Sequence, residues 1–250
     1  MRRLDRIDEF LLTLVRLRLG APEEDLTYRF EVSQSRVSKI LTNWLPFLAA
    51  QFKGLISWPT VGPCHGIFSN FPNTVAAMDC TQVFTERPYN LQSQKAMYSD
   101  YKSHTTIKYL GAVDIFTGAF VFLSGGQSGN ASDRYMVETS GILDVLIPGQ
   151  RVFADRGFKV YDLFAKNRAF LTIPSFMKGR AQLPANEALI SRLMASGRIH
   201  VERAFGRLHE FRILNRVQPI KQSKGLLDDM VVIAAALCNL QPRLIKHQEM

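Results

Sequence analysis

Three acidic residues in this chain stand where carboxylates could hold metal ions. Asp79 follows the apolar run Thr-Val-Ala-Ala-Met, and Asp155 follows Val-Phe-Ala. Glu202 lies in the string Arg-Ile-His-Val-Glu-Arg, which we interpret as part of a helix. Carboxylate oxygens are the ligands that hard divalent cations prefer. If the fold brings the three acids together, they form a site for two such cations, which is the chemistry that cuts and joins phosphodiesters.

Each acid also has a simpler interpretation. A single aspartate at a strand end is more often a turn or cap residue, and a single helical glutamate usually faces solvent. The apolar residues before Asp79 and Asp155 favour the catalytic interpretation. For Asp133 we favour a helix N-cap over a residue that orients a metal ligand. Arg198 precedes Glu202 by one helical turn and could orient its carboxylate or clamp a phosphate.

The charge of the chain favours an acidic polymer as partner. Lys and Arg number 31 against 22 Asp and Glu, a net charge of +9. Bases are dense from Arg198 to Lys224, and because this run surrounds a candidate catalytic acid we favour nucleic acid over a solvated face. The residues that we expect to contact DNA are Arg36, Lys39, Lys102, His104, Lys178, Arg180, Arg203 and Arg207. For Lys102 and His104, a role in keeping an edge strand soluble is an equal alternative.

Length and composition are those of an ordinary globular protein. The chain has 250 residues, of which 46% are hydrophobic and 21% charged, enough for one large domain and one small one. Three scattered cysteines form neither a disulfide framework nor a zinc site. The first residues do not form a signal peptide, and the longest apolar run, 230–238, is shorter than the ~20 residues that span a bilayer. We therefore expect a soluble intracellular protein.

The first part of the chain predicts three helices that end in a helix-turn-helix pattern. Apolar spacing predicts a helix over residues 4–19, a short one after Pro22, and a third that begins at an N-cap, Ser33. The third helix would direct inward Val37, Ile40, Leu41 and Trp44, and would expose Gln34, Ser35, Arg36, Ser38 and Lys39. This pattern is typical of a DNA-reading helix. The alternative is a three-helix bundle used for dimerisation or as a lid.

The remainder predicts an α/β domain of the ribonuclease H-like class, a mixed sheet flanked by helices. We expect a helical domain over 1–52, a linker over 53–73, the α/β domain over 74–242 and a tail over 243–250. The predicted strands are 75–84, 105–113, 119–124, 150–154 and 169–173. The predicted helices are 132–146, 161–167, 187–214 and 226–240, with a loop over 175–185.

Several strings, taken together and in order, resemble one known family. The chain resembles the DDE endonuclease domain of PIF/Harbinger-type transposases and their domesticated relatives in animals, over roughly residues 22–242. The strings that carry the resemblance are 78–81, 86–88, 98–105, 132–133, 154–158, 198–203 and 237–240.

This resemblance implies a ribonuclease H-like fold, two Mg²⁺ or Mn²⁺ ions and cut-and-paste chemistry on double-stranded DNA in the nucleus. Residue by residue, it makes Asp79 the first aspartate, Asp155 the second and Glu202 the glutamate of a DDE triad. Bacterial relatives carry a Tyr-x2-Arg-x3-Glu pattern, of which Arg198 and Glu202 are present while Ala195 replaces the tyrosine. Family members often work with a Myb-like protein that supplies DNA recognition and nuclear import, and a homodimer is a further candidate assembly.

A second hypothesis needs no catalysis. A domesticated DNA-binding or scaffold protein could keep the fold, the helix-turn-helix and the basic charge while it works with a Myb-like partner. Metal-dependent cleavage of DNA distinguishes the two hypotheses.

Overall fold

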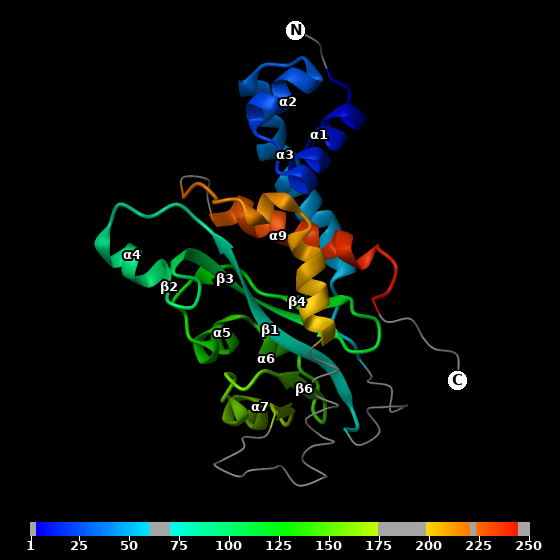
Figure 1. Ribbon diagram of the computed structural model, residues 1–250. Helices are drawn as coiled ribbons and strands as arrows, with labels where there is room; N and C mark the ends of the chain where they lie inside the picture. The colour runs from blue at the N-terminus through cyan, green and yellow to red at the C-terminus, as the bar shows by residue number, and fades with distance from the viewer. Residues whose placement is uncertain (1–3, 61–70, 175–198, 221–223, 245–250) are drawn as a thin grey trace.

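The computed structural model describes residues 4–60, 71–174, 199–220 and 224–244. Figure 1 shows a group of helices at the N-terminal end standing over a sheet that carries further helices on both sides. Within the described residues, no helix is both long enough and apolar enough to cross a membrane.

Three helices form the N-terminal part, as the sequence predicts. They are α1 (Arg6–Leu19), α2 (Glu23–Phe30) and α3 (Gln34–Phe52). The Asp5 carboxylate caps α1 by accepting the Asp8 N–H at 2.8 Å, and Gly20 ends that helix in the left-handed region at φ 62°. Ser33 caps α3 through its hydroxyl, which accepts the Arg36 N–H at 3.3 Å.

The two faces of α3 are divided as predicted. Val37, Ile40 and Leu41 are buried against the other helices, while the polar residues from Gln34 to Lys39 are exposed. Trp44 is only half-buried, because its indole N–H donates to the Glu9 carboxylate at 3.0 Å near the surface.

The sheet is mixed and has the strand order β2-β3-β1-β6-β7, with β4 and β5 pairing β3 as well. Strand β1 runs antiparallel to β3 and parallel to β6, and β6 runs parallel to β7. This arrangement confirms the predicted ribonuclease H-like α/β fold. The strands are β1 (Thr74–Phe84), β2 (Tyr98–Ser99), β3 (His104–Asp114), β4 (Phe120–Leu123), β5 (Gln127–Ser128), β6 (Arg151–Ala154) and β7 (Phe170–Thr172).

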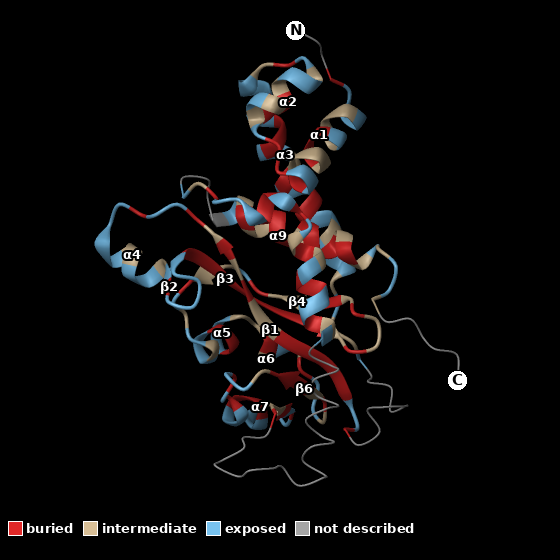
Figure 2. Cartoon of the chain, in the orientation of Figure 1, coloured by how far each residue is buried: buried red, intermediate tan, exposed pale blue. Residues whose placement is uncertain are grey.

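Helices cover both faces of this sheet, and successive β1 side chains enter different apolar clusters. Ala77 joins the cluster that contains α1, α3, residues 199–209 and α9, whereas Met78 joins the cluster of α5, α6 and α7. Figure 2 shows the resulting buried centre of the sheet. The further elements are η1 (Lys53–Leu55), α4 (Leu91–Met97), α5 (Asp133–Thr139), α6 (Ile142–Val145), α7 (Tyr161–Lys166), helical residues 199–209, η3 (Arg212–Asn215) and α9 (Lys224–Asn239).

Two predicted helices differ from the structure. The helix expected over 132–146 is two short helices, α5 and α6, because Gly141 at φ 81° breaks the chain between them. The helix expected over 187–214 is described only from residue 199, and it ends at His209 before the 3₁₀ turn η3. Residues 187–198 and the predicted loop 175–185 lie outside the described residues.

The Asn239 side chain ties three segments together at the end of α9. Its Oδ1 accepts the Phe120 N–H at 2.7 Å, and its Nδ2 donates to the carbonyls of Phe120 and Leu55 at 2.8 and 2.9 Å. The amide thereby pairs with the backbone of β4 as a neighbouring strand would, and holds the segment that follows α3.

Asn239→Ala will lower the free energy of unfolding by about 2–3 kcal/mol, because it leaves an N–H and two carbonyls of the backbone without their partner. Denaturant titration followed by circular dichroism measures the change. Asn43→Ala is the matched control, since Asn43 is exposed on α3. Equal losses of unfolding free energy in the two variants would contradict this stabilising role of the Asn239 side chain.

Candidate active site

The pairing of β1 with β6 brings Asp79 and Asp155 to neighbouring positions. Met78 pairs with Ala154 in the parallel ladder, so the next residue on each chain is one of the two aspartates. Adjacent strands lie ~4.8 Å apart. Ala77 and Phe153, two residues earlier on each chain, enter the same apolar cluster, and side-chain alternation directs the aspartates toward that face. Both are half-buried.

The backbone orients each of these carboxylates locally. Asp79 Oδ1 accepts the Cys80 N–H at 2.7 Å, and Asp155 Oδ1 accepts the Arg156 N–H at 2.6 Å. An ionised carboxylate offers about four lone-pair sites on its two oxygens. Oxygen donors of this kind match the preference of Mg²⁺.

Helical residues 199–209 cross the face toward which the aspartates point. Val201, Phe205 and Leu208 lie in the apolar cluster of that face. Phe205 covers Gly111, the β3 residue directly opposite Asp79, so closely that a Cβ added to this glycine would lie 2.9 Å from the ring. Glu202 precedes Phe205 by one helical turn and is exposed.

The structure therefore brings two of the predicted ligands together and places the third on the helix above the same face. Among the described residues, no group of three or more His, Cys, Asp or Glu side chains lies close enough to hold one metal ion. Asp79 and Asp155 come from adjacent strands, and Glu202 comes from an element packed over their neighbour Gly111.

Asp133 does not cap a helix, and that prediction is wrong. Ser132 is the N-cap of α5, and its hydroxyl accepts the Tyr135 N–H at 3.1 Å. The Asp133 carboxylate instead accepts from Lys108 Nζ at 2.8 Å, and that ammonium also donates to the Ala131 carbonyl at 2.9 Å. The sequence signal for Lys108 is weak, because a lysine in an apolar strand usually reaches solvent.

The same Asp133 carboxylate supports the turn that follows Asp155. A Cβ added to Gly157 would lie 2.8 Å from Asp133 Oδ2, so the carboxylate lies directly against this glycine. Asp133 thus packs against the turn that follows the candidate ligand Asp155.

The cysteine next to Asp79 is not a nucleophile at neutral pH. Burial raises the pKa of the Cys80 thiol to about 12, and the nearby Lys108 only partly opposes this effect. A thiol with so high a pKa stays protonated and inert.

A hydrogen-bond chain that the sequence did not reveal anchors the end of helical residues 199–209 to β1. Asn215 Nδ2 donates to the His209 carbonyl at 2.7 Å, which leaves Asn215 Oδ1 to accept from His209 Nδ1 at 2.8 Å. His209 Nε2 then accepts from the Thr81 hydroxyl at 2.9 Å. Thr81 lies two residues after Asp79, on the same side of the strand.

The predicted DNA contacts of the N-terminal part lie on α3. Arg36 is exposed but forms an ion pair with Glu9 of α1. Lys39 is exposed one turn further along. The ion pair holds Arg36 against the helical bundle, so Lys39 offers the more accessible charge.

The other predicted contacts are spread over the α/β domain. Lys102 lies over the Tyr101 ring, 5.2 Å from its centre, and His104 begins β3. Arg203 is exposed, while Arg207 donates to the Pro242 carbonyl at 2.7 Å. Lys178, Arg180 and Arg198 lie outside the described residues.

Comparison with protein families agrees with this architecture. Residues 2–54 match the helix-turn-helix of DDE superfamily endonuclease, and residues 78–239 match the DDE superfamily endonuclease domain itself. The chain therefore belongs to the DDE superfamily endonucleases, a transposase-type class of nucleases, and its helix-turn-helix marks it as a DNA-binding protein. A comparison with curated proteins gave no match.

Gly111→Ala will displace the helix that carries Glu202, because the new methyl group would overlap the Phe205 ring. We expect a loss of about 1–3 kcal/mol in unfolding free energy, measured by denaturant titration. The double variant Gly111→Ala/Phe205→Leu should recover part of it, which a double-mutant cycle measures.

Gly206→Ala provides the matched control, since an added Cβ there meets nothing within 4 Å. Alanine favours a helix over glycine by about 1 kcal/mol, so this variant should be slightly more stable. A Gly111→Ala protein as stable as the parent would contradict the close packing of Phe205.

His209 will make the fold sensitive to mild acid. Burial lowers the pKa of His209, and nearby Lys102 lowers it further, although the bond to Asn215 opposes both. The unfolded chain therefore binds the proton first, so unfolding free energy falls as the pH drops through ~6.5. Denaturant titration at pH 7.5 and pH 5.5 should show a smaller difference for His209→Gln than for the parent protein.

An unchanged pH dependence in His209→Gln would show that His209 does not titrate with folding.

Proposed function

We propose that this protein is a divalent-metal-dependent DNA endonuclease of the transposase type, with Asp79, Asp155 and Glu202 as its catalytic residues. The observation that carries the proposal is the parallel register of β1 and β6, which makes Asp79 and Asp155 neighbours in a member of the DDE superfamily. Glu202 completes the triad from the helix that packs over Gly111.

The donor chemistry fits two Mg²⁺ or Mn²⁺ ions. In the proposed site Asp79 and Asp155 supply oxygens from the strands, and Glu202 supplies them from the helix. When bound, a pair of such ions activates the attacking oxygen and stabilises the leaving oxygen of an in-line displacement at phosphorus.

The residues around the triad have supporting roles in this proposal. The N–H groups of Cys80 and Arg156 orient the two aspartates, and Asp133 packs against the turn after Asp155. Phe205 covers the sheet beside Asp79. Arg203 is exposed next to Glu202, where its charge can attract a DNA phosphate.

We expect the N-terminal helices to hold double-stranded DNA. The exposed polar face of α3 begins at Gln34 and contains Lys39, in the position of a reading helix. Cleavage and strand joining then act on a substrate that the same chain has bound. The PIF/Harbinger subfamily, the nucleus as the site of action, the Myb-like partner and a homodimer belong to this proposal.

Asp155→Asn will abolish metal-dependent cleavage while leaving the fold intact, because an amide replaces a charged ligand with a neutral one. The substrate is a supercoiled plasmid, which reports single nicks without knowledge of the target sequence. EDTA should stop cleavage by the parent protein, and Mn²⁺ added in excess should restore it.

Asp144→Asn is the matched control, because Asp144 is exposed on α6, on the other side of the sheet. It should cleave at the parent rate. Parent-like cleavage by Asp155→Asn, with circular dichroism unchanged, would refute the assignment of the triad.

A catalytically silent DNA-binding protein is the second candidate. The observation that favours it is the exposed face of α3, which can bind DNA without any metal site. Binding that weakens steeply with salt, together with no cleavage of any DNA in Mg²⁺ or Mn²⁺, would select this function over the first.

A further inference from the structure

The connection between β1 and β3 is much longer than the pairing of these strands requires. The antiparallel ladder continues to Phe84 and Thr106, yet residues 85–103 intervene before β3 begins. Antiparallel neighbours are usually joined by loops of about 2–5 residues. Here the intervening residues form an arm that contains α4 and β2 and projects from the side of the sheet (Figure 1).

This arm is fixed to the body of the protein. Strand β2 pairs with β3 through Tyr98 and Thr105, and the Ala96 carbonyl accepts the Asn130 N–H at 3.1 Å. At its base, the Glu86 N–H donates to the Gln218 carbonyl at 2.9 Å. Because the arm is anchored at these points, a hollow between the arm and the sheet is formed before any ligand binds.

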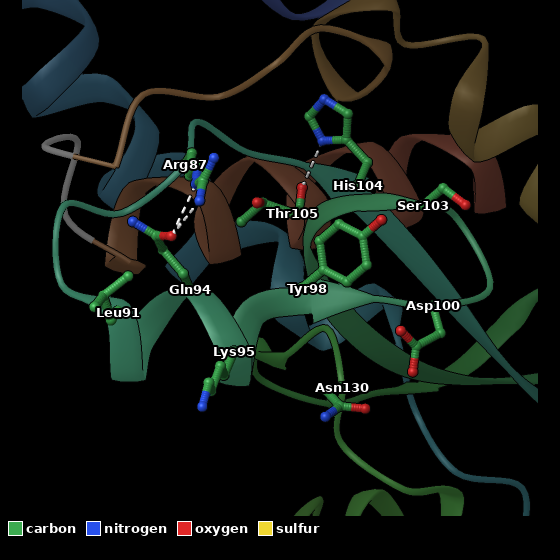
Figure 3. A pocket seen from close by; sticks show the side chains of 10 residues that line it. All are labelled: Arg87, Leu91, Gln94, Lys95, Tyr98, Asp100, Ser103, His104, Thr105 and Asn130. Carbon is green, nitrogen blue, oxygen red and sulfur yellow. Dashed lines mark hydrogen bonds between the residues drawn. The ribbon is translucent and has the colours of Figure 1, made fainter.

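The hollow between the arm and the start of β3 has a volume of about 740 Å³. Ligand pockets in proteins commonly have volumes of about 300–1,000 Å³, which is enough for one nucleotide. Figure 3 shows its lining, which is Arg87, Leu91, Gln94, Lys95, Tyr98, Asp100, Ser103, His104, Thr105 and Asn130.

Two cations on the arm face this hollow, and one of them is held in a fixed orientation. Gln94 Oε1 accepts from Arg87 Nε at 2.8 Å and from Arg87 Nη2 at 2.6 Å, while Gln94 Nε2 donates to the Pro88 carbonyl at 2.7 Å. The guanidinium is therefore oriented by a neutral amide, which leaves its charge uncompensated by that contact. Lys95 is exposed on α4 and lines the same hollow, with its ammonium pointing away from Arg87 in Figure 3. An oriented guanidinium suits a phosphate group, and a flexible ammonium on the same arm adds to the positive charge of the hollow.

A ring and several hydrogen-bonding groups lie between these cations and the far wall. The Tyr98 ring, 44% exposed, stands in the middle of the hollow in Figure 3, with Arg87 to one side and Asp100 to the other. His104 Nδ1 donates to the Thr105 carbonyl at 3.1 Å, so the other ring nitrogen, Nε2, is not used in this bond. Asn130 adds an amide. A ring for stacking and mixed donors and acceptors match a nucleobase.

The hollow lies far enough from the candidate active site for one DNA strand to reach both. Gly111 is opposite Asp79, and Thr105 in the hollow lies six residues earlier on β3. At ~3.4 Å per residue this corresponds to ~20 Å along the strand. A DNA strand rises ~3.4 Å per nucleotide, so the separation is about six nucleotides.

We propose that this hollow binds one unpaired nucleotide of a DNA strand, with its base stacked on Tyr98 and its phosphate held by Arg87. That the polymer is DNA rests on the proposed function, but the preference for an unpaired nucleotide does not. An acidic protein segment would use the two cations yet would not need the ring and the amide. Paired bases cannot enter, because their faces are stacked within the duplex.

Binding of a fluorescent single-stranded oligonucleotide tests the proposal. It is measured by anisotropy on the full chain carrying Asp155→Asn, in EDTA, so that neither metal nor cleavage contributes. Adding Tyr98→Ala should weaken single-strand binding about tenfold, the effect of losing one stacked base. Binding of a duplex of the same sequence should change less than twofold. Tyr98→Phe should retain the parent affinity, which separates stacking from the hydroxyl group.

Tyr161→Ala is the control, because Tyr161 is similarly exposed, at 49%, but lies on α7 away from the hollow. It should leave both affinities unchanged. Equal weakening of single-strand and duplex binding by Tyr98→Ala, or no change in either, would overturn the proposal. A Tyr98→Ala effect confined to binding of a protein partner would likewise refute it.

Cleavage is a separate measurement. Failure of the parent protein to cleave plasmid DNA, with the Tyr98 effect intact, would remove the proposed enzyme function and leave the nucleotide site. Cleavage by the parent protein without an effect of Tyr98→Ala on single-strand binding would leave the proposed enzyme function and remove the nucleotide site.

Discussion

The central strand β1 is the constraint on which the rest of the structure depends. It is paired on both edges, antiparallel to β3 and parallel to β6, and it is covered on both faces. A strand in that position has little freedom in register, since a shift of one residue would exchange its two faces. The place of Asp79 relative to Asp155 follows directly from this fixed register.

The helix above β1 depends on the same register through contacts of a different kind. A missing side chain at Gly111 allows Phe205 to approach the sheet beside Asp79, and the chain of bonds through His209 fixes the other end of the helix at Thr81. One contact is close packing and the other is directional hydrogen bonding. Together they determine where Glu202 stands, although Glu202 itself lies at the surface.

The N-terminal helices and the α/β domain are mechanically joined in this protein. Apolar residues of α1 and α3 belong to the same cluster as β1 and α9, and Asn239 ties the segment after α3 to β4. A continuous apolar core of this kind resists movement of one part against the other. DNA held on α3 would therefore keep a defined position relative to the sheet and to the arm between β1 and β3.

The sequence by itself determined the fold class, the helix-turn-helix and most of the strands. These follow from local hydrophobic periodicity, from capping residues such as Ser33, and from the apolar runs before Asp79 and Asp155. It failed where a single residue decides between alternatives, as at Gly141, which divides α5 from α6. The role of Asp133 could not be predicted, because its partner Lys108 is 25 residues away in the chain. Only the tertiary structure determined the Asp133–Lys108 ion pair, the Thr81–His209 hydrogen bond and the hollow between the arm and β3. Each of these joins segments that no local sequence pattern connects.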